Sequence, residues 1–184
     1  MRVLGRQRGE TLIEVMVAVI VFSIGVLGIA LMQIKGAQFS KQSGARTVAV
    51  LQTRSLADAM RANPAGVYGV SAATGIPAQI TALNGNLSNS YYLYNGTTAP
   101  NPATDCVGAN VACVQARTDL QNWINQLKLG TASPTTSGST TVTSGKVVVN
   151  TNTGSLSIIS SWAQTIPNQS GTSTNDSYQF DYQP

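Results

Sequence analysis

The stretch Arg6–Met32, RQRGETLIEVMVAVIVFSIGVLGIALM, decides the architecture of this chain. From Val15 to Met32 it has eighteen residues without a charge or a proline. Eighteen helical residues are about 27 Å long, close to the hydrocarbon thickness of a bilayer. The run therefore predicts a transmembrane helix. Three basic residues precede Gly9 and predict a cytoplasmic N-terminal end: Arg2, Arg6 and Arg8.

One acid, Glu14, lies just inside the start of this helix. A carboxylate at that depth costs roughly 3 kcal/mol unless a positive charge pairs with it. Cleavage after Gly9 would create such a charge, the new amino group of Glu10. That amine and Glu14 would lie one helical turn apart, so they can pair within one chain or between neighbouring copies. A third interpretation leaves Glu14 near the interface, solvated by lipid headgroups.

The string Gly9-Glu10-Thr11-Leu12-Ile13-Glu14-Val15 resembles the N-terminal motif of type IV pilins and type II secretion pseudopilins. The resemblance implies that a prepilin peptidase cleaves between Gly9 and Glu10, and that Glu10 is then N-methylated. It also implies that Glu14, the fifth mature residue, acts in subunit assembly. The chain departs from the family in having Glu10 where Phe or Met usually stands.

Composition fits a membrane segment followed by one extracellular domain. The 184 residues are 10% charged and carry a formal net charge of +4. Removing residues 1–9 discards three arginines and leaves eight Lys and Arg against seven Asp and Glu. The mature chain is therefore almost neutral, so its charge predicts no nucleic-acid site.

The two cysteines, Cys106 and Cys113, follow the membrane segment, and the chain has no histidine. An even pair in that position predicts a disulfide formed in an oxidising compartment. A metal site is the weaker interpretation, because two thiols do not complete a tetrahedral ligand set. We expect no metal and no cofactor.

The first helix is expected to change character along its length. Residues 10–33 are expected to form the transmembrane or filament-core segment, and residues 34–63 are expected to form the amphipathic half of the same helix. The helix is expected to end near Asn63, because Pro64 disfavours helical geometry in the residue before it. Apolar residues of this half recur at steps of three and four, which predicts one packed face: Ile34, Ala37, Ala45, Val48, Leu51, Leu56, Ala59 and Met60.

Residues 64–184 are expected to form a globular head. Residues 110–129 predict a second helix with one buried face (Ala112, Ala116, Leu120, Trp123, Ile124 and Leu127). Residues 146–150 and 156–162 predict a hairpin, 178–182 a third strand, and 90–94 a further short strand. The predicted fold is α+β: a long N-terminal helix on a small antiparallel sheet.

Within the pilin family, the end of the long helix (residues 56–66) and the segment 116–127 resemble PilV-type minor pilins. This resemblance implies a minor pilin that helps to prime pilus assembly at the tip, with roles in adhesion and twitching motility. The implied partners are prepilin peptidase, other minor pilins, the major pilin, the inner-membrane assembly platform and the lipid bilayer. The implied location is the bacterial inner membrane before assembly and the cell surface afterwards.

The sequence gives little support to an enzyme. Without histidine there is no Ser-His or Cys-His arrangement, and no Gly-rich phosphate loop follows a strand. Two other interpretations stay open: a minor pseudopilin of a type II secretion system, and a single-pass anchored periplasmic domain that never assembles. An ordinary secretory signal peptide is disfavoured because the apolar run is too long.

Overall fold

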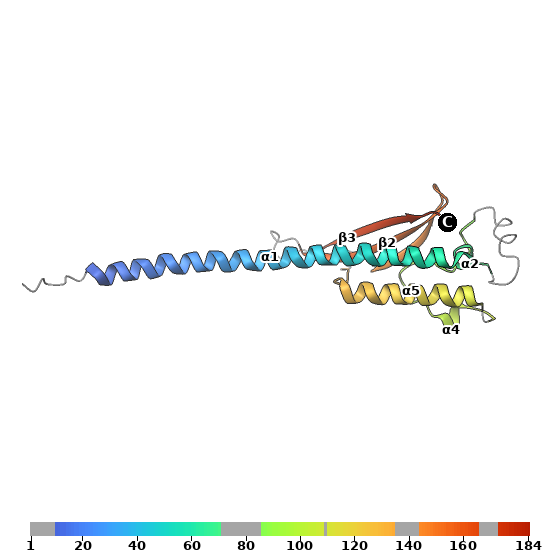
Figure 1. Ribbon diagram of the computed structural model, residues 1–184, viewed down its shortest axis with the longest axis horizontal. Coiled ribbons are helices and arrows are strands. Elements are labelled where there is room, and N and C mark those ends of the chain that lie inside the picture. Colours follow the sequence, from blue (N-terminus) through green and yellow to red (C-terminus); the bar gives the residue numbers. More distant parts are fainter. Residues whose placement is uncertain (1–9, 71–85, 109, 135–143, 166–172) are drawn as a thin grey trace, which may run out of the picture. The chain divides into compact units, whose positions relative to one another are not determined.

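A computed structural model describes residues 10–70, 86–108, 110–134, 144–165 and 173–184 (Figure 1). The first helix, α1, runs Glu10–Ala62 and is 53 residues long. The chain divides into two compact units, Met1–Lys41 and Gln42–Pro184, and each is described by itself. The first unit contains the apolar part of α1, and the second contains the rest of α1 and the head.

The end of α1 is set by Asn63 and Pro64. Because Pro64 has no backbone N–H and restricts the residue before it, α1 ends at Ala62, close to the predicted position. A short helix that the sequence analysis missed, α2 (Pro64–Tyr68), begins at once, and the Asn63 side chain accepts a hydrogen bond from Gly66 N at 3.1 Å. Gly69, with φ 68°, ends α2 in the left-handed region.

Two further helices follow in the head. The short α4 spans Pro102–Asp105, and α5 spans Val111–Gly130, displaced by one residue from the predicted range. Asn110 caps α5, because its side chain accepts hydrogen bonds from Ala112 N and Cys113 N. All six residues of the predicted apolar face are buried, including Trp123 at 3% exposure.

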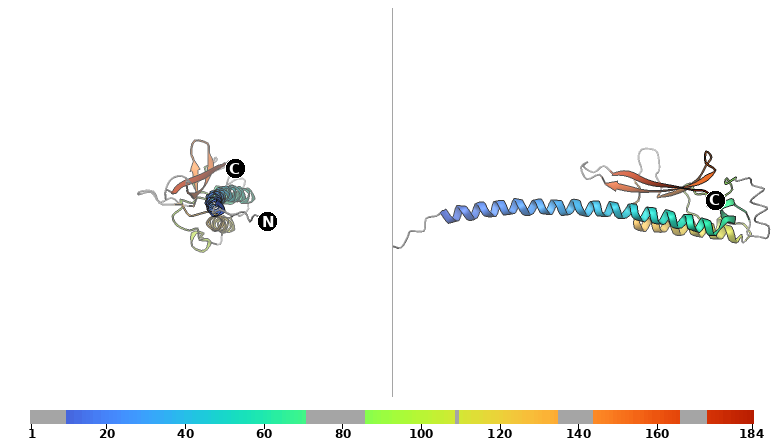
Figure 2. Two further views of the ribbon diagram at one scale, coloured as in Figure 1. Left: turned by 90° about the vertical axis from the view of Figure 1, so that its left-hand side faces the viewer. Right: turned by 45° about the horizontal axis from the view of Figure 1, so that its top comes forward.

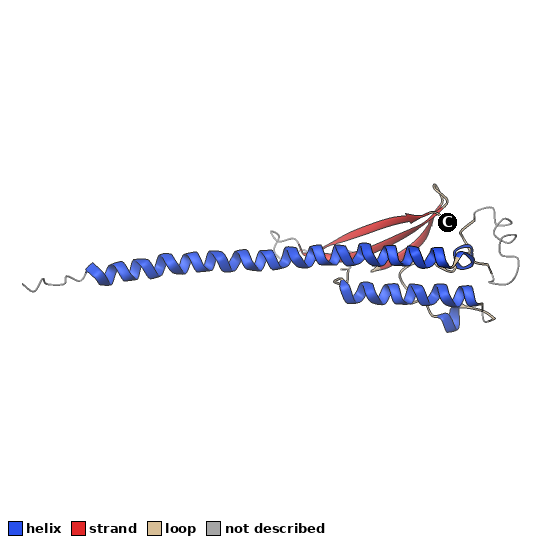
Figure 3. Cartoon of the chain, viewed as in Figure 1, coloured by secondary structure: helices blue, strands red, loops and turns tan. Residues whose placement is uncertain are grey.

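Three antiparallel strands form one sheet in the order β1-β2-β3 (Figure 3). They are β1 (Gly145–Asn150), β2 (Ser155–Thr165) and β3 (Ser173–Tyr182). The register pairs Val147 with Ile158 and Ile158 with Phe180. The β1–β2 connection turns at Gly154, whose φ is 64°. The predicted α+β architecture, a long helix packed on a small antiparallel sheet, is confirmed.

Within the second unit, α1 runs beside both the sheet and α5 (Figure 2). Thr53 of α1 meets Ser160 of β2, and Val48 of α1 packs against Gly130 at the end of α5. The helix α5 also reaches the sheet, because Trp123 packs against Gly145 of β1. One hydrophobic core joins the three elements through residues such as Met60, Leu120 and Ile158, all completely buried.

Two details of the sequence analysis were wrong. Residues 90–94 are not a strand: they form turns, and only Tyr94 pairs, through an isolated bridge to Val147. Three residues of the predicted packed face of α1 are exposed: Ile34, Ala37 and Leu51. Leu51 is 58% exposed, whereas Ala49 and Thr53, two residues before and after it, are completely buried. The packed part of α1 is therefore rotated away from Leu51 and includes a polar residue.

Candidate functional site

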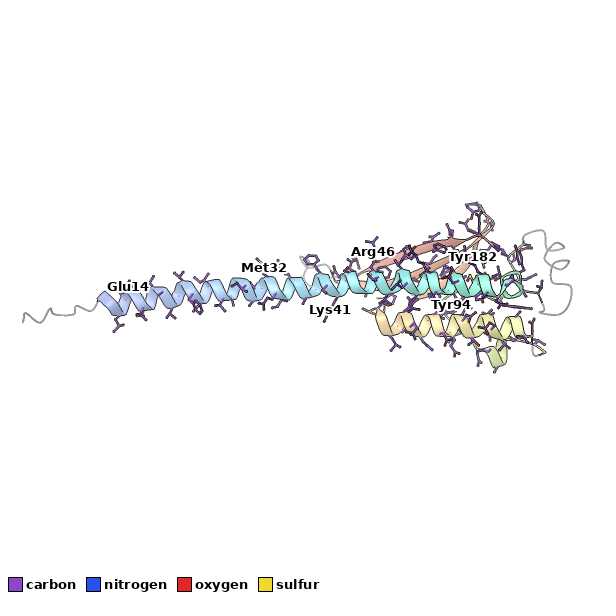
Figure 4. All side chains as sticks on the ribbon, in the orientation of Figure 1. Glu14, Met32, Lys41, Arg46, Tyr94 and Tyr182 are labelled. Atoms are coloured by element: carbon purple, nitrogen blue, oxygen red, sulfur yellow. A yellow bond between two sulfur atoms is a disulfide. The ribbon has the colours of Figure 1, made fainter. Side chains whose placement is uncertain are left out.

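The N-terminal part of α1 exposes apolar side chains on every side. Its large apolar residues between Leu12 and Ile34 are 47–76% exposed, and they include Phe22 at 72%. Figure 4 shows side chains projecting above and below the helix between Glu14 and Met32. A helix that is apolar all round is stable only in lipid or among other apolar surfaces. In the described part of the chain, α1 alone is long and apolar enough to cross a membrane.

Glu14 lies one helical turn after Glu10 and is exposed. Between Leu12 and Gln33 it is the one charged residue. Glu10 is the first residue of α1, whereas Gly9 lies outside the described residues. The predicted cleavage position is thus at the start of the helix, and the proposed partner of Glu14 is a terminal amine that exists only after cleavage. The roles of Gly9, Glu10 and Glu14 stay predictions.

The predicted disulfide is present in the head. Cys106 and Cys113 are bonded, with their Cα atoms 5.7 Å apart. Cys106 directly follows α4 and Cys113 lies in the first turn of α5. The bond therefore ties the loop before α5 to the helix itself, where the Asn110 cap also acts.

A buried tyrosine, Tyr92, joins three segments of the head. Its hydroxyl donates to Asp119 Oδ2 at 2.7 Å, and it accepts a hydrogen bond from Asn63 Nδ2 at 3.4 Å. Tyr92 is completely buried. Burial, with the neighbouring Asp119 carboxylate, raises the pKa of Tyr92 well above its ordinary value. At physiological pH the group is a neutral hydrogen-bond donor, so its role here is structural.

The sequence analysis missed one polar pair, Arg117 and Asp105. Arg117 Nε lies 3.5 Å from Asp105 Oδ2, and its Nη1 donates to the carbonyl oxygen of Leu93 at 3.0 Å. The three residues come from α5, α4 and the loop at 86–101, so no local spacing connects them. The one sequence signal for this contact was the predicted disulfide, because Cys106 follows Asp105 directly and Cys113 precedes Arg117 by one helical turn.

One comparison with known proteins gives a match. Residues 4–30 match the model of the prokaryotic N-terminal methylation motif. No curated protein and no solved structure matches the chain. The matched residues include Gly9, Glu10, Glu14 and most of the exposed apolar part of α1. The motif supports a type IV pilin-like or pseudopilin-like protein, processed by a prepilin peptidase and anchored by an apolar N-terminal helix.

Proposed function

We propose that this chain is a minor pilin subunit of a type IV pilus, and that it helps to prime assembly at the pilus tip. One observation carries the proposal that the chain is an assembling subunit: a methylation motif leads directly into an apolar helix that is exposed all round. The minor-pilin role rests on the resemblance of residues 56–66 and 116–127 to PilV-type minor pilins. The helix continues without a break into a folded head. Such a chain is built to be held first by lipid and then by other helices, and we assign it no catalytic role.

The proposed pathway follows from the free energy of burying α1. The precursor inserts with residues 1–9 on the cytoplasmic side, and cleavage after Gly9 frees the amine of Glu10. Glu14 then attracts that amine on an adjacent subunit, which removes an unpaired charge from lipid and fixes the axial register. Inside a filament, neighbouring apolar helices replace the lipid around residues such as Phe22.

The first experiment measures the intact mass and N-terminal sequence of the chain from cells with and without prepilin peptidase. A mature chain beginning at Glu10, formed only when the enzyme is present, supports the proposal. An uncleaved chain in both strains would overturn it, because Glu14 would then lack its amine. It would favour a plain membrane-anchored domain instead.

A second experiment tests assembly through Glu14→Ala. The variant is expected to be cleaved normally and to be lost from sheared surface filaments. Val15→Leu is the matched control, because it alters the neighbouring side chain and keeps the charge. Normal incorporation of Glu14→Ala would refute the pairing of Glu14 with a terminal amine.

The methylation motif equally supports a minor pseudopilin of a type II secretion system. Co-purification separates the two, since the proposed pilus subunit is captured with pilus minor subunits and the pseudopilin with secretion subunits. A chain found in membrane fractions and never in filaments of either kind would instead be a non-assembling periplasmic domain.

A further inference from the structure

Among the residues that the structure describes, the outer edge of β1 is unpaired at Val149. Val147 exchanges two backbone hydrogen bonds with Tyr94, of 2.8 and 2.9 Å, on the side of β1 away from β2. Backbone groups of alternate residues in a strand point to the same side. The N–H and C=O of Val149 therefore point outward too, and they have no hydrogen-bond partner among the residues that the structure describes.

This position is open because Tyr92 leaves the edge. The pairing of Tyr94 with Val147, continued antiparallel, would place Tyr92 opposite Val149. Instead the chain turns at Tyr91 and Tyr92, and the Tyr92 side chain enters the core to reach Asp119. The pairing of this segment with β1 is therefore limited to the single bridge between Tyr94 and Val147.

A groove of about 650 Å³ lies along this edge. Its walls are largely apolar and include three consecutive residues of β1. The apolar lining residues are Leu93, Tyr94, Pro100, Val147, Val148 and Val149. Arg117 and Asp105 form its charged end. A volume of this order accommodates a short peptide or a comparable ligand.

Asp105 and Arg117 differ in how far their hydrogen-bonding groups are already used within the chain. Asp105 already accepts hydrogen bonds from Asn101 N at 3.0 Å and from Thr104 Oγ1 at 3.1 Å. Arg117 donates from Nη1 to a neutral carbonyl, while its Nε is buried and makes no hydrogen bond in the described residues. A guanidinium has five N–H donors, so Arg117 retains capacity for a carboxylate.

We propose that the groove binds an extended peptide segment of a partner protein that carries a carboxylate. Its backbone pairs with the N–H and C=O of Val149, its apolar side chains contact the groove wall, and its carboxylate binds Arg117. The carboxylate is that of the peptide C-terminus or of an acidic side chain. The site belongs to the head, so binding does not require that the chain enters a filament.

The test is fluorescence anisotropy with the full-length chain in detergent micelles and labelled six-residue Val/Thr peptides. Three probes are used: a free C-terminus, an amidated C-terminus, and an amidated peptide with one internal Glu. Saturable binding of the first or third probe, and at least about tenfold weaker binding of the second, is expected. Binding of the first alone identifies a terminal carboxylate, and equal binding of all three overturns the role of Arg117.

Two variants localise the binding. Arg117→Gln is expected to weaken binding of the carboxylate probe at least about tenfold, whereas substitution of an exposed arginine of α1, Arg54→Ala, leaves it unchanged. Val149→Pro removes the outward N–H without touching the ladder to β2, and is expected to weaken all probes. Circular dichroism confirms that each variant is folded. Absence of saturable binding to the unmodified chain, or binding unaffected by both groove variants, would overturn the proposal.

Discussion

The hydroxyl of Thr53 on α1 lies 2.6 Å from the hydroxyl of Ser160 on β2, and both side chains are completely buried. The contact spans 107 residues of sequence and joins the long helix to the centre of the sheet. Removing one partner of a buried hydrogen bond destabilises a protein more than replacing both partners by apolar groups, because the remaining hydroxyl is left buried without a partner. It therefore fixes how α1 is rotated on the sheet.

Thr53→Val is expected to destabilise the head by about 1–3 kcal/mol, because it keeps the side-chain volume and leaves Ser160 without this partner. The double variant Thr53→Val/Ser160→Ala is expected to recover part of the loss. Urea unfolding followed by tryptophan fluorescence measures both, since Trp123 and Trp162 are both buried in the head. Additive losses in the double variant would show that the two hydroxyls do not act together.

The same contact explains why the periodicity of α1 was only partly predictive. Counting apolar residues placed Leu51 on the packed face, yet Thr53 occupies it and Leu51 is exposed. The buried residues of this part of α1 do follow a single face, with Ala49, Thr53, Leu56 and Met60 at i, i+4, i+7 and i+11. Counting apolar residues alone overlooked the polar Thr53 and so included Leu51. The six residues predicted for the buried face of α5 are all apolar and all buried.

The prediction of a short strand at residues 90–94 was wrong because contacts with residues distant in sequence decide the conformation of this segment. Three tyrosines favour a strand by propensity, but the hydrogen bond from Tyr92 to Asp119 and burial of its ring turn the chain into the core. Neither partner is near in sequence. The groove at Val149 and Arg117 exists because of that turn, so sequence reasoning could not find it. The N-terminal motif, in contrast, is local and was recognised directly.

Alkaline pH is expected to destabilise the head through Tyr92. Its pKa is raised in the folded state, mainly by burial, relative to an ordinary value of 10.0. The folded state thus favours the neutral phenol, and this contribution is complete below pH 10 and decreases as pH rises above it. Tyr92→Phe cannot ionise and is expected to lose about 1–2 kcal/mol at pH 7 and to show a shallower alkaline decline. Urea unfolding at pH 7 to 11 measures both, and parallel pH curves for the two proteins would contradict the assignment.

Gly69 and Gly154 form a matched pair for testing close packing. Both have φ in the left-handed region, 68° and 64°. A Cβ at Gly154 would meet nothing within 4 Å, whereas one at Gly69 would collide with the Asn89 carbonyl. Gly154→Ala is expected to cost about 1 kcal/mol from backbone strain, and Gly69→Ala at least about 2 kcal/mol more. Equal losses in urea unfolding would mean that Gly69 is selected by its backbone angle alone.

Removing the disulfide through Cys106→Ser/Cys113→Ser is expected to destabilise the head by about 2.5 kcal/mol, the chain-entropy value for so short a loop. Because Asp105 directly precedes Cys106, the variant is also expected to loosen the charged end of the groove. Urea unfolding of the oxidised chain and the variant gives the first quantity. The single variant Cys113→Ser is the control, because it also lacks the bond but retains the thiol of Cys106. Unchanged stability in both variants would rule out a structural role for the bond.

Gly25 and Gly28 lie on one face of the apolar part of α1, and a Cβ at either would meet nothing within 4 Å in this chain. The substitution Gly25→Leu/Gly28→Leu therefore carries no packing cost in the isolated subunit and adds apolar surface that lipid accepts. If neighbouring helices approach closely at these glycines in a filament, the larger side chains keep them apart. Normal membrane insertion and cleavage are expected, with reduced recovery in sheared filaments. Ala30→Leu adds a single leucine side chain on the opposite face and is compared with the single variant Gly28→Leu. It is expected to assemble normally, and equal loss in both single variants would show that bulk anywhere on α1 disrupts assembly.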